Sequence, residues 1–175
     1  MQNAFQNIRK IDSAKLQKDI MENLKYLYKA ICFQEIPNEI SLSYSITGCP
    51  NKCKGCHSPE LRADIGSPLL ADLEYDILKN KDAISCVLFL GGDSHKQIST
   101  LIKCAEICKK YNLKTALYSG KNTLDTTLFH YFDYIKIGEY IEELGGLKSP
   151  KTNQRLYKKN KNKYEDITHL FWRKI

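Results

Sequence analysis

The chain has 175 residues, of which 42% are hydrophobic and 27% charged, and its formal net charge at pH 7 is +7. This length and composition are typical of one globular domain and exclude a fibrous repeat or a disordered polymer. The longest apolar run, residues 83–90, is far shorter than a membrane span, and residues 1–15 lack the apolar core of a secretion signal. We therefore expect a soluble, cytoplasmic protein. The positive charge permits a nucleotide, nucleic acid or acidic partner without indicating any of them.

The first predicted elements are a helix and a hairpin. Residues 1–24 are polar with apolar side chains at helical spacing, and they predict an N-terminal helical extension to a single domain of residues 25–175. In residues 41–46, apolar side chains alternate with serines, as in a half-buried strand. This strand follows an apolar segment that begins near Tyr28, and it leads directly into the cysteine-rich stretch 47–57.

Beyond that stretch, predicted helices and strands alternate. The elements are a helix that starts at Ser67–Pro68, a strand over 85–90, a helix over 98–108, a strand over 114–118, a short helix over 124–129, a strand over 134–137 and a terminal helix from Glu165. Residues 140–163 have no clear periodicity. The alternation is typical of a mostly parallel α/β sheet with right-handed crossovers. Four such strands and a hairpin predict an incomplete (βα) barrel, since a full eightfold barrel takes ~250 residues.

Several chemically distinctive segments follow the carboxyl ends of these strands, which is the edge where ligands bind in parallel α/β proteins. They are the cysteine-rich stretch 47–57, the turn Gly91, Gly92 and Asp93, the pair Ser119–Gly120 and the pair Gly138–Glu139. Lys136 lies at the end of the last strand of this group. Their common position predicts a ligand site at this edge.

The cysteine-rich stretch predicts a metal centre. Cys49, Cys53 and Cys56 have the spacing C-x3-C-x2-C. Three thiolates on a four-iron cluster leave one iron without a protein ligand, free for a substrate or cosubstrate. Zinc bound by these cysteines and His57 is the alternative, although structural zinc sites usually use two well-separated ligand pairs. We favour the iron–sulfur interpretation.

The other four of the seven cysteines have a simpler interpretation. An odd number of cysteines without a secretion signal disfavours a disulfide framework. Cys86 falls in a predicted strand, Cys104 and Cys108 fall in a predicted helix, and Cys32 falls in the first apolar segment. We interpret all four as small buried hydrophobic residues.

The three cysteines, followed one βα unit later by Gly91–Asp93, resemble the defining motifs of the radical S-adenosylmethionine enzymes. The resemblance implies a [4Fe–4S] cluster on the cysteines and S-adenosylmethionine as cosubstrate, with the Gly-Gly-acidic motif binding its methionine ammonium. Ser119, His57 and Lys136 are further candidate contacts of the cosubstrate, as is Glu139. Many members have an aromatic residue directly before the third cysteine, where this chain has Gly55, and they often have proline after the acidic residue, where this chain has Ser94–His95.

More specifically, the chain resembles the activating proteins of anaerobic ribonucleoside-triphosphate reductase. The similar stretches are 33–39, 46–61, 88–93, 115–120 and 134–157. This resemblance implies that reductive cleavage of S-adenosylmethionine gives methionine and a 5′-deoxyadenosyl radical, which abstracts hydrogen from a glycine of the large reductase subunit. It implies a radical-enzyme barrel over residues 25–175, and a flavodoxin- or ferredoxin-type protein as reductant.

Other functions stay open. A small radical S-adenosylmethionine enzyme of the deazapurine-synthesis type would act on a small molecule in a closed pocket. A non-enzymatic metal-binding module would dock nucleic acid through the basic run 148–163, which is otherwise a solvated loop or a surface for a protein partner. A plain electron carrier usually ligates every iron with protein groups, so three cysteines disfavour it. We favour the activase, with no membrane or nucleic-acid partner.

Overall fold

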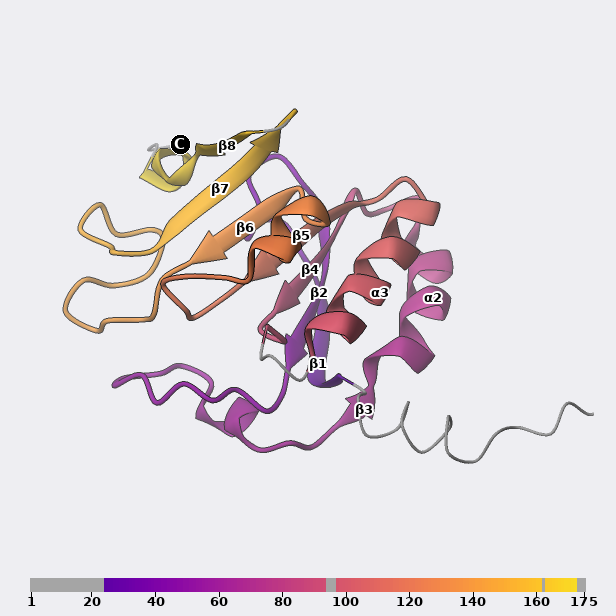
Figure 1. Ribbon diagram of the computed structural model, residues 1–175, viewed down its shortest axis with the longest axis horizontal. Coiled ribbons are helices and arrows are strands. Elements are labelled where there is room, and N and C mark those ends of the chain that lie inside the picture. The colour runs from indigo at the N-terminus through magenta and orange to yellow at the C-terminus, as the bar shows by residue number, and fades with distance from the viewer. Residues whose placement is uncertain (1–23, 94–96, 162, 173–175) are drawn as a thin grey trace, which may run out of the picture.

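The computed structural model describes residues 24–93, 97–161 and 163–172. The predicted helix within residues 1–24 therefore lies outside the described residues, as do Ser94 and His95, although Leu24 itself is fully buried. The described chain forms an eight-stranded mixed sheet with the strand order β3-β1-β2-β4-β5-β6-β7-β8 (Figure 1). The strands are β1 Lys25–Cys32, β2 Ser41–Ile46, β3 Ser67–Pro68, β4 Cys86–Leu90, β5 Lys114–Tyr118, β6 Tyr134–Ile137, β7 Arg155–Asn160 and β8 Lys163–Asp166.

The centre of the sheet is parallel and its flanks are antiparallel. Strands β2, β4, β5 and β6 pair parallel to one another, while β1 and β3 on one side and β7 and β8 on the other pair antiparallel. The βα alternation predicted from the sequence produces this parallel centre, because each crossover returns the chain to the same end of the sheet. The incomplete barrel stays a prediction.

Two helices cover one face of the sheet, where Figure 1 shows them side by side: α2 Leu69–Asn80 and α3 Ile98–Lys110. Val87 and Phe89 of β4 join the main hydrophobic core between the sheet and these helices, while Cys86 and Leu88 point into a smaller cluster on the opposite face. Strand β4 is thus buried on both faces, as its unbroken apolar run predicts. Neither helix, nor any other in the described part of the chain, has the length and apolar character that crossing a membrane requires.

The predicted start of the helix at Ser67–Pro68 is wrong. Ser67 and Pro68 form the short strand β3, which pairs with the start of β1, and α2 begins only at Leu69, without a side-chain cap. The proline ring suits either role because its fixed backbone angle is compatible with an extended strand end. The sequence pattern thus locates the start of the helix to within two residues but misses the strand pairing.

The C-terminal region also differs from the prediction. Residues 140–163 contain β7, and β8 occupies the start of the predicted terminal helix, so that only a 3₁₀ turn, Thr168–Trp172, follows it. Asp166 accepts hydrogen bonds from the backbone N–H and the hydroxyl of Thr168 and so holds the start of this turn. Strand β7 was missed because it is only half buried and rich in lysine, and so shows little hydrophobic alternation.

Candidate metal centre

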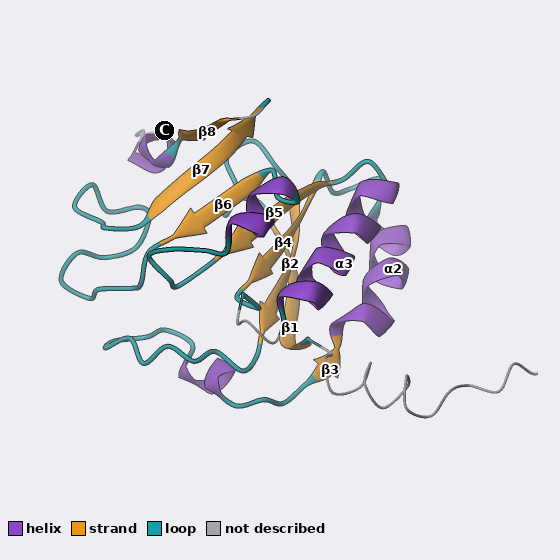
Figure 2. Ribbon diagram, in the orientation of Figure 1, coloured by secondary structure: helices purple, strands orange, loops and turns teal. Residues whose placement is uncertain are grey.

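A cavity of about 520 Å³ lies at the carboxyl edge of the parallel strands. Its wall includes one register row that crosses all four strands, in which neighbouring residues are directly paired: Ser45, Leu90, Tyr118 and Lys136. Parallel pairing brings the strand ends to one edge, so segments far apart in the sequence converge there. Figure 2 shows the connections 47–66 and 138–154 projecting from this edge of the sheet.

The three predicted cluster ligands, Cys49, Cys53 and Cys56, all line this cavity. Each is a half-buried free thiol. Their loop is fastened to the segment that follows it, because the Cys49 N–H donates to the Leu61 carbonyl at 3.0 Å and the Arg62 guanidinium donates to the Cys53 carbonyl at 3.3 Å. The backbone contacts therefore hold the loop with its thiols facing a common space.

The donor set fits a cluster better than a single ion. In the described residues, no three His, Cys, Asp or Glu side chains gather closely enough to hold one metal ion. A closed tetrahedral zinc site needs all its ligands around one centre. Cysteines that bind different irons of a cubane stand farther apart, and soft thiolates are the usual ligands of iron–sulfur clusters. Three thiols on one cavity wall match the cluster in chemistry and in number.

The glycine turn after β4 reaches the same cavity. Gly91 lines it, and both Gly91 (φ +97°) and Gly92 (φ +89°) have left-handed backbone angles that favour glycine. Asp93 lies outside the cavity lining and is 8% exposed. The Ser119 hydroxyl donates to the Asp93 carboxylate at 2.7 Å, and the Lys121 ammonium lies 3.5 Å from it. The structure thus brings together the predicted Asp93 and Ser119, and adds Lys121, which the sequence analysis had not named.

Lys136 places a buried ammonium group on the cavity wall. It is 8% exposed, and its Nζ donates to the carbonyls of Ser119 at 3.2 Å and Gly138 at 2.9 Å. Burial lowers the pKa of Lys136 to about 8, because the charged form loses its hydration. Glu139, by contrast, is exposed and lines a different cavity.

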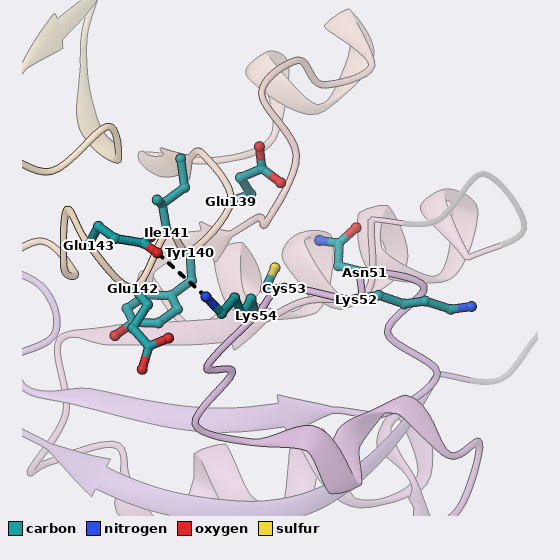
Figure 3. A pocket seen from close by; sticks show the side chains of 9 residues that line it. All are labelled: Asn51, Lys52, Cys53, Lys54, Glu139, Tyr140, Ile141, Glu142 and Glu143. Atoms are coloured by element: carbon teal, nitrogen blue, oxygen red, sulfur yellow. Dashed lines mark ion pairs between the residues drawn. The ribbon is translucent and has the colours of Figure 1, made fainter.

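That second cavity, of about 440 Å³, adjoins the first and shares Asn51, Cys53 and Tyr140 with it (Figure 3). It separates the cysteine loop from the acidic segment after β6, and the Lys54 ammonium lies 3.7 Å from the Glu143 carboxylate across it. Asn51 fits closely against Gly120, where an added Cβ would lie 2.2 Å from the Asn51 amide nitrogen. The glycine after the end of β5 was the one sequence signal for this contact between Asn51 and Gly120.

His57 and Tyr140 meet at the junction of the cavities, with ring centroids 4.8 Å apart and planes inclined by 51°. Sequence analysis named His57 as a candidate and missed Tyr140, since a tyrosine in an irregular loop gives no signal on its own. Gln154, on the loop before β7, also lines the first cavity and donates to the Gly138 carbonyl at 3.3 Å. It too was missed.

The remaining predicted features have mixed outcomes. Cys86, Cys104 and Cys108 are fully buried, as predicted, while Cys32 is only half buried. The basic run 148–163 is divided between a loop and strands β7 and β8, and several of its cations are tied to the fold. Lys159, for example, donates to the backbone carbonyls of Phe129 and His130.

Comparison with known proteins agrees with the geometry. Residues 39–163, more than half of the chain, match the model of a family described as 4Fe-4S single cluster domain. No curated protein and no solved structure matches the chain. The matched range contains the three cysteines, the glycine turn and Lys136, and its cofactor agrees with the donor set of the cavity. The chain therefore belongs to the 4Fe-4S single cluster domain family and is an iron–sulfur protein.

Proposed function

We propose that this iron–sulfur protein is a radical S-adenosylmethionine activase that generates the glycyl radical of anaerobic ribonucleoside-triphosphate reductase. One observation carries the proposal: the three thiols, the glycine turn and a buried ammonium group converge on one cavity from separate strand ends. A cluster that served electron transfer alone would need no such array of polar groups beside it. Four of the five sequence stretches similar to reductase activating proteins, 46–61, 88–93, 115–120 and 134–157, reach this same edge.

The number of cysteines supports cosubstrate binding. Cys49, Cys53 and Cys56 supply three ligands, so a four-iron cluster held by them keeps one iron open. When bound, the cluster and S-adenosylmethionine supply the chemistry by which one electron cleaves a carbon–sulfur bond and yields a 5′-deoxyadenosyl radical. The chain contributes position and environment, as proteins with demanding cofactors generally do.

The polar groups beside the cysteines suit the two charges of an amino acid. The Asp93 carboxylate already has the Lys121 ammonium 3.5 Å away, which supports the proposal that a primary ammonium suits this position. The buried Lys136 ammonium is the corresponding partner for a carboxylate. Together they would orient the methionine portion of the cosubstrate, while Leu90 and Tyr118 supply walls that exclude water.

The partner would reach the cavity from the side of the long loops. The site lies between the cysteine loop and the segment 138–154, and a second cavity continues it outward. A glycine-bearing peptide loop of the large reductase subunit can approach along this opening. A flavodoxin- or ferredoxin-type protein would deliver the electron to the cluster.

The test is anaerobic reconstitution with iron and sulfide, reduction with dithionite and measurement of 5′-deoxyadenosine formed from S-adenosylmethionine. We expect product from the wild type and none from Cys53→Ala, while Cys32→Ala, which removes a half-buried thiol outside the cavity, retains activity. Mixing with the cognate reductase should then produce a glycyl-radical EPR signal. A fully loaded cluster that forms no 5′-deoxyadenosine would refute the proposal.

A further inference from the structure

The aromatic pair His57 and Tyr140 has no role in the proposed function as described above, although His57 is one of the candidate contacts predicted from the sequence. Both rings line the cavity that holds the three thiols, and Tyr140 also lines the adjoining cavity. Their centroids are 4.8 Å apart. Tyr140 is half buried, so its ring packs on the protein and still borders open space.

A glycine of the cysteine loop lies close to the segment that carries Tyr140. Gly55 has φ +69°, and a Cβ added there would lie 2.9 Å from the Glu142 carboxyl carbon. The segment after β6 therefore lies directly on the cysteine loop, because Gly55 presents no side chain. In the same region the ring of Tyr140, two residues before Glu142, packs against that of His57, which follows Cys56.

The other aromatic residue on the wall, Tyr118, is already engaged. Its hydroxyl donates to the Glu35 carbonyl, and the Lys136 ammonium lies 6.0 Å from its ring centroid. Within the described part of the chain Tyr140 has neither constraint, and its ring contacts His57. Of the two tyrosines, Tyr140 is the one placed to receive a flat, apolar ligand group.

We propose that Tyr140, supported by His57, is the surface on which the adenine ring of S-adenosylmethionine stacks. The inference rests on the proposed function, which requires an adenosyl ligand in this cavity. The flat face of a purine packs against the face of an aromatic ring, and such stacking is a common means by which proteins bind a base. The polar groups at Asp93 and Lys136 then bind the amino-acid portion, so the two ends of the ligand are held by different side chains.

The test is equilibrium binding to the oxidised, cluster-loaded protein, in which no cleavage occurs. The dissociation constants of S-adenosylmethionine and L-methionine are measured by anaerobic calorimetry. We expect Tyr140→Ala and Tyr140→Leu to weaken S-adenosylmethionine binding roughly 5- to 150-fold, the range given by one base stacked on one ring. Tyr140→Phe keeps the π face and should stay within about twofold of wild type. Tyr75→Ala, which removes a tyrosine that is 68% exposed on α2, is the matched control.

L-methionine, which lacks the base, should bind all these variants equally, and their iron content should equal that of wild type. Unchanged S-adenosylmethionine affinity in Tyr140→Ala and Tyr140→Leu would overturn this inference and leave the proposed function intact. A Tyr140 variant that loses iron together with S-adenosylmethionine affinity would show that Tyr140 maintains the structure of the loop. This result would also overturn the inference. A loaded wild-type protein that does not bind S-adenosylmethionine would overturn the inference and the proposed function together.

Discussion

Replacement of Asp93 by asparagine isolates the charge that we assign to ammonium binding. The asparagine side chain has nearly the same shape and keeps an oxygen that can accept the Ser119 hydroxyl, now 2.7 Å from the carboxylate. The Asp93 side chain is 9% exposed, whereas the Lys121 ammonium, 3.5 Å from it, belongs to a side chain that is 31% exposed. Such a partly solvated pair contributes only about 0–1 kcal/mol to stability. We therefore expect the fold and the cluster to survive the change.

The effect on ligand binding should be larger. A hydrogen bond between a charged donor and a charged acceptor contributes about 1.5–3 kcal/mol, which corresponds to roughly 10- to 150-fold in affinity. The low exposure of Asp93 keeps solvent screening small, which favours the upper half of that range. We expect Asp93→Asn to weaken S-adenosylmethionine binding by this factor and to lower 5′-deoxyadenosine formation at subsaturating ligand.

The assay is anaerobic calorimetry on the cluster-loaded variant, with iron content and urea denaturation measured in parallel. Asp64→Asn is the matched control, since Asp64 also pairs with a lysine, Lys25, at 3.3 Å but lies on the exposed surface. An Asp93→Asn protein with full iron content and unchanged affinity would refute the assignment of Asp93 to the ammonium group.

Three further predictions concern the scaffold. Burial raises the pKa of the Glu39 carboxyl, but hydrogen bonds from one lysine, one serine and one tyrosine lower it by more, so that its pKa lies below the ordinary value of 4.5. The stabilisation that results is present above pH 4.5 and is lost as the pH falls through the pKa of the folded state. Glu39→Gln should therefore cost about 1–3 kcal/mol in urea denaturation at pH 7 and less in acid, and equal losses at both pH values would contradict this. Burial raises the pKa of the Cys86 and Cys104 thiols to about 12, and that of Cys108 well above its usual value, so iodoacetamide at pH 8 should spare all three in the folded protein, as mass spectrometry would reveal. Gly138→Ala should lower the unfolding free energy by about 1–3 kcal/mol, because φ is +107° and the new Cβ would lie 3.0 Å from neighbouring backbone; an unchanged denaturation midpoint would argue against this strain.

The sequence predicted the central elements because their local signals agree with their tertiary role. Strand β4 is an unbroken apolar run that is buried on both faces, and β2 alternates directly before the cysteines. The spacing of the three cysteines predicted a shared cavity, since ligands within one short loop have few other ways to be arranged. The place of Gly91–Asp93 beside the site was predictable because this turn directly follows a parallel strand.

The parts that were missed depend on contacts between distant segments. Strand β7 is defined by its pairing with β6 and carries two lysines, one exposed and one half buried, so its own pattern is weak. Tyr140 reaches the site because the segment after β6 meets the cysteine loop, where its ring packs against that of His57, more than eighty positions earlier in the sequence. Lys121 joins Asp93 across two strand ends, a juxtaposition that parallel pairing creates and that no local periodicity encodes.

The most direct test of the account is the EPR spectrum of the reduced, fully loaded protein before and after addition of S-adenosylmethionine. A cluster held by Cys49, Cys53 and Cys56 alone has one iron open to the ligand. We therefore predict that S-adenosylmethionine changes the cluster spectrum, and that L-methionine at saturating concentration also perturbs it through the same iron. A loaded, reduced cluster whose spectrum is identical with and without saturating S-adenosylmethionine would contradict the account.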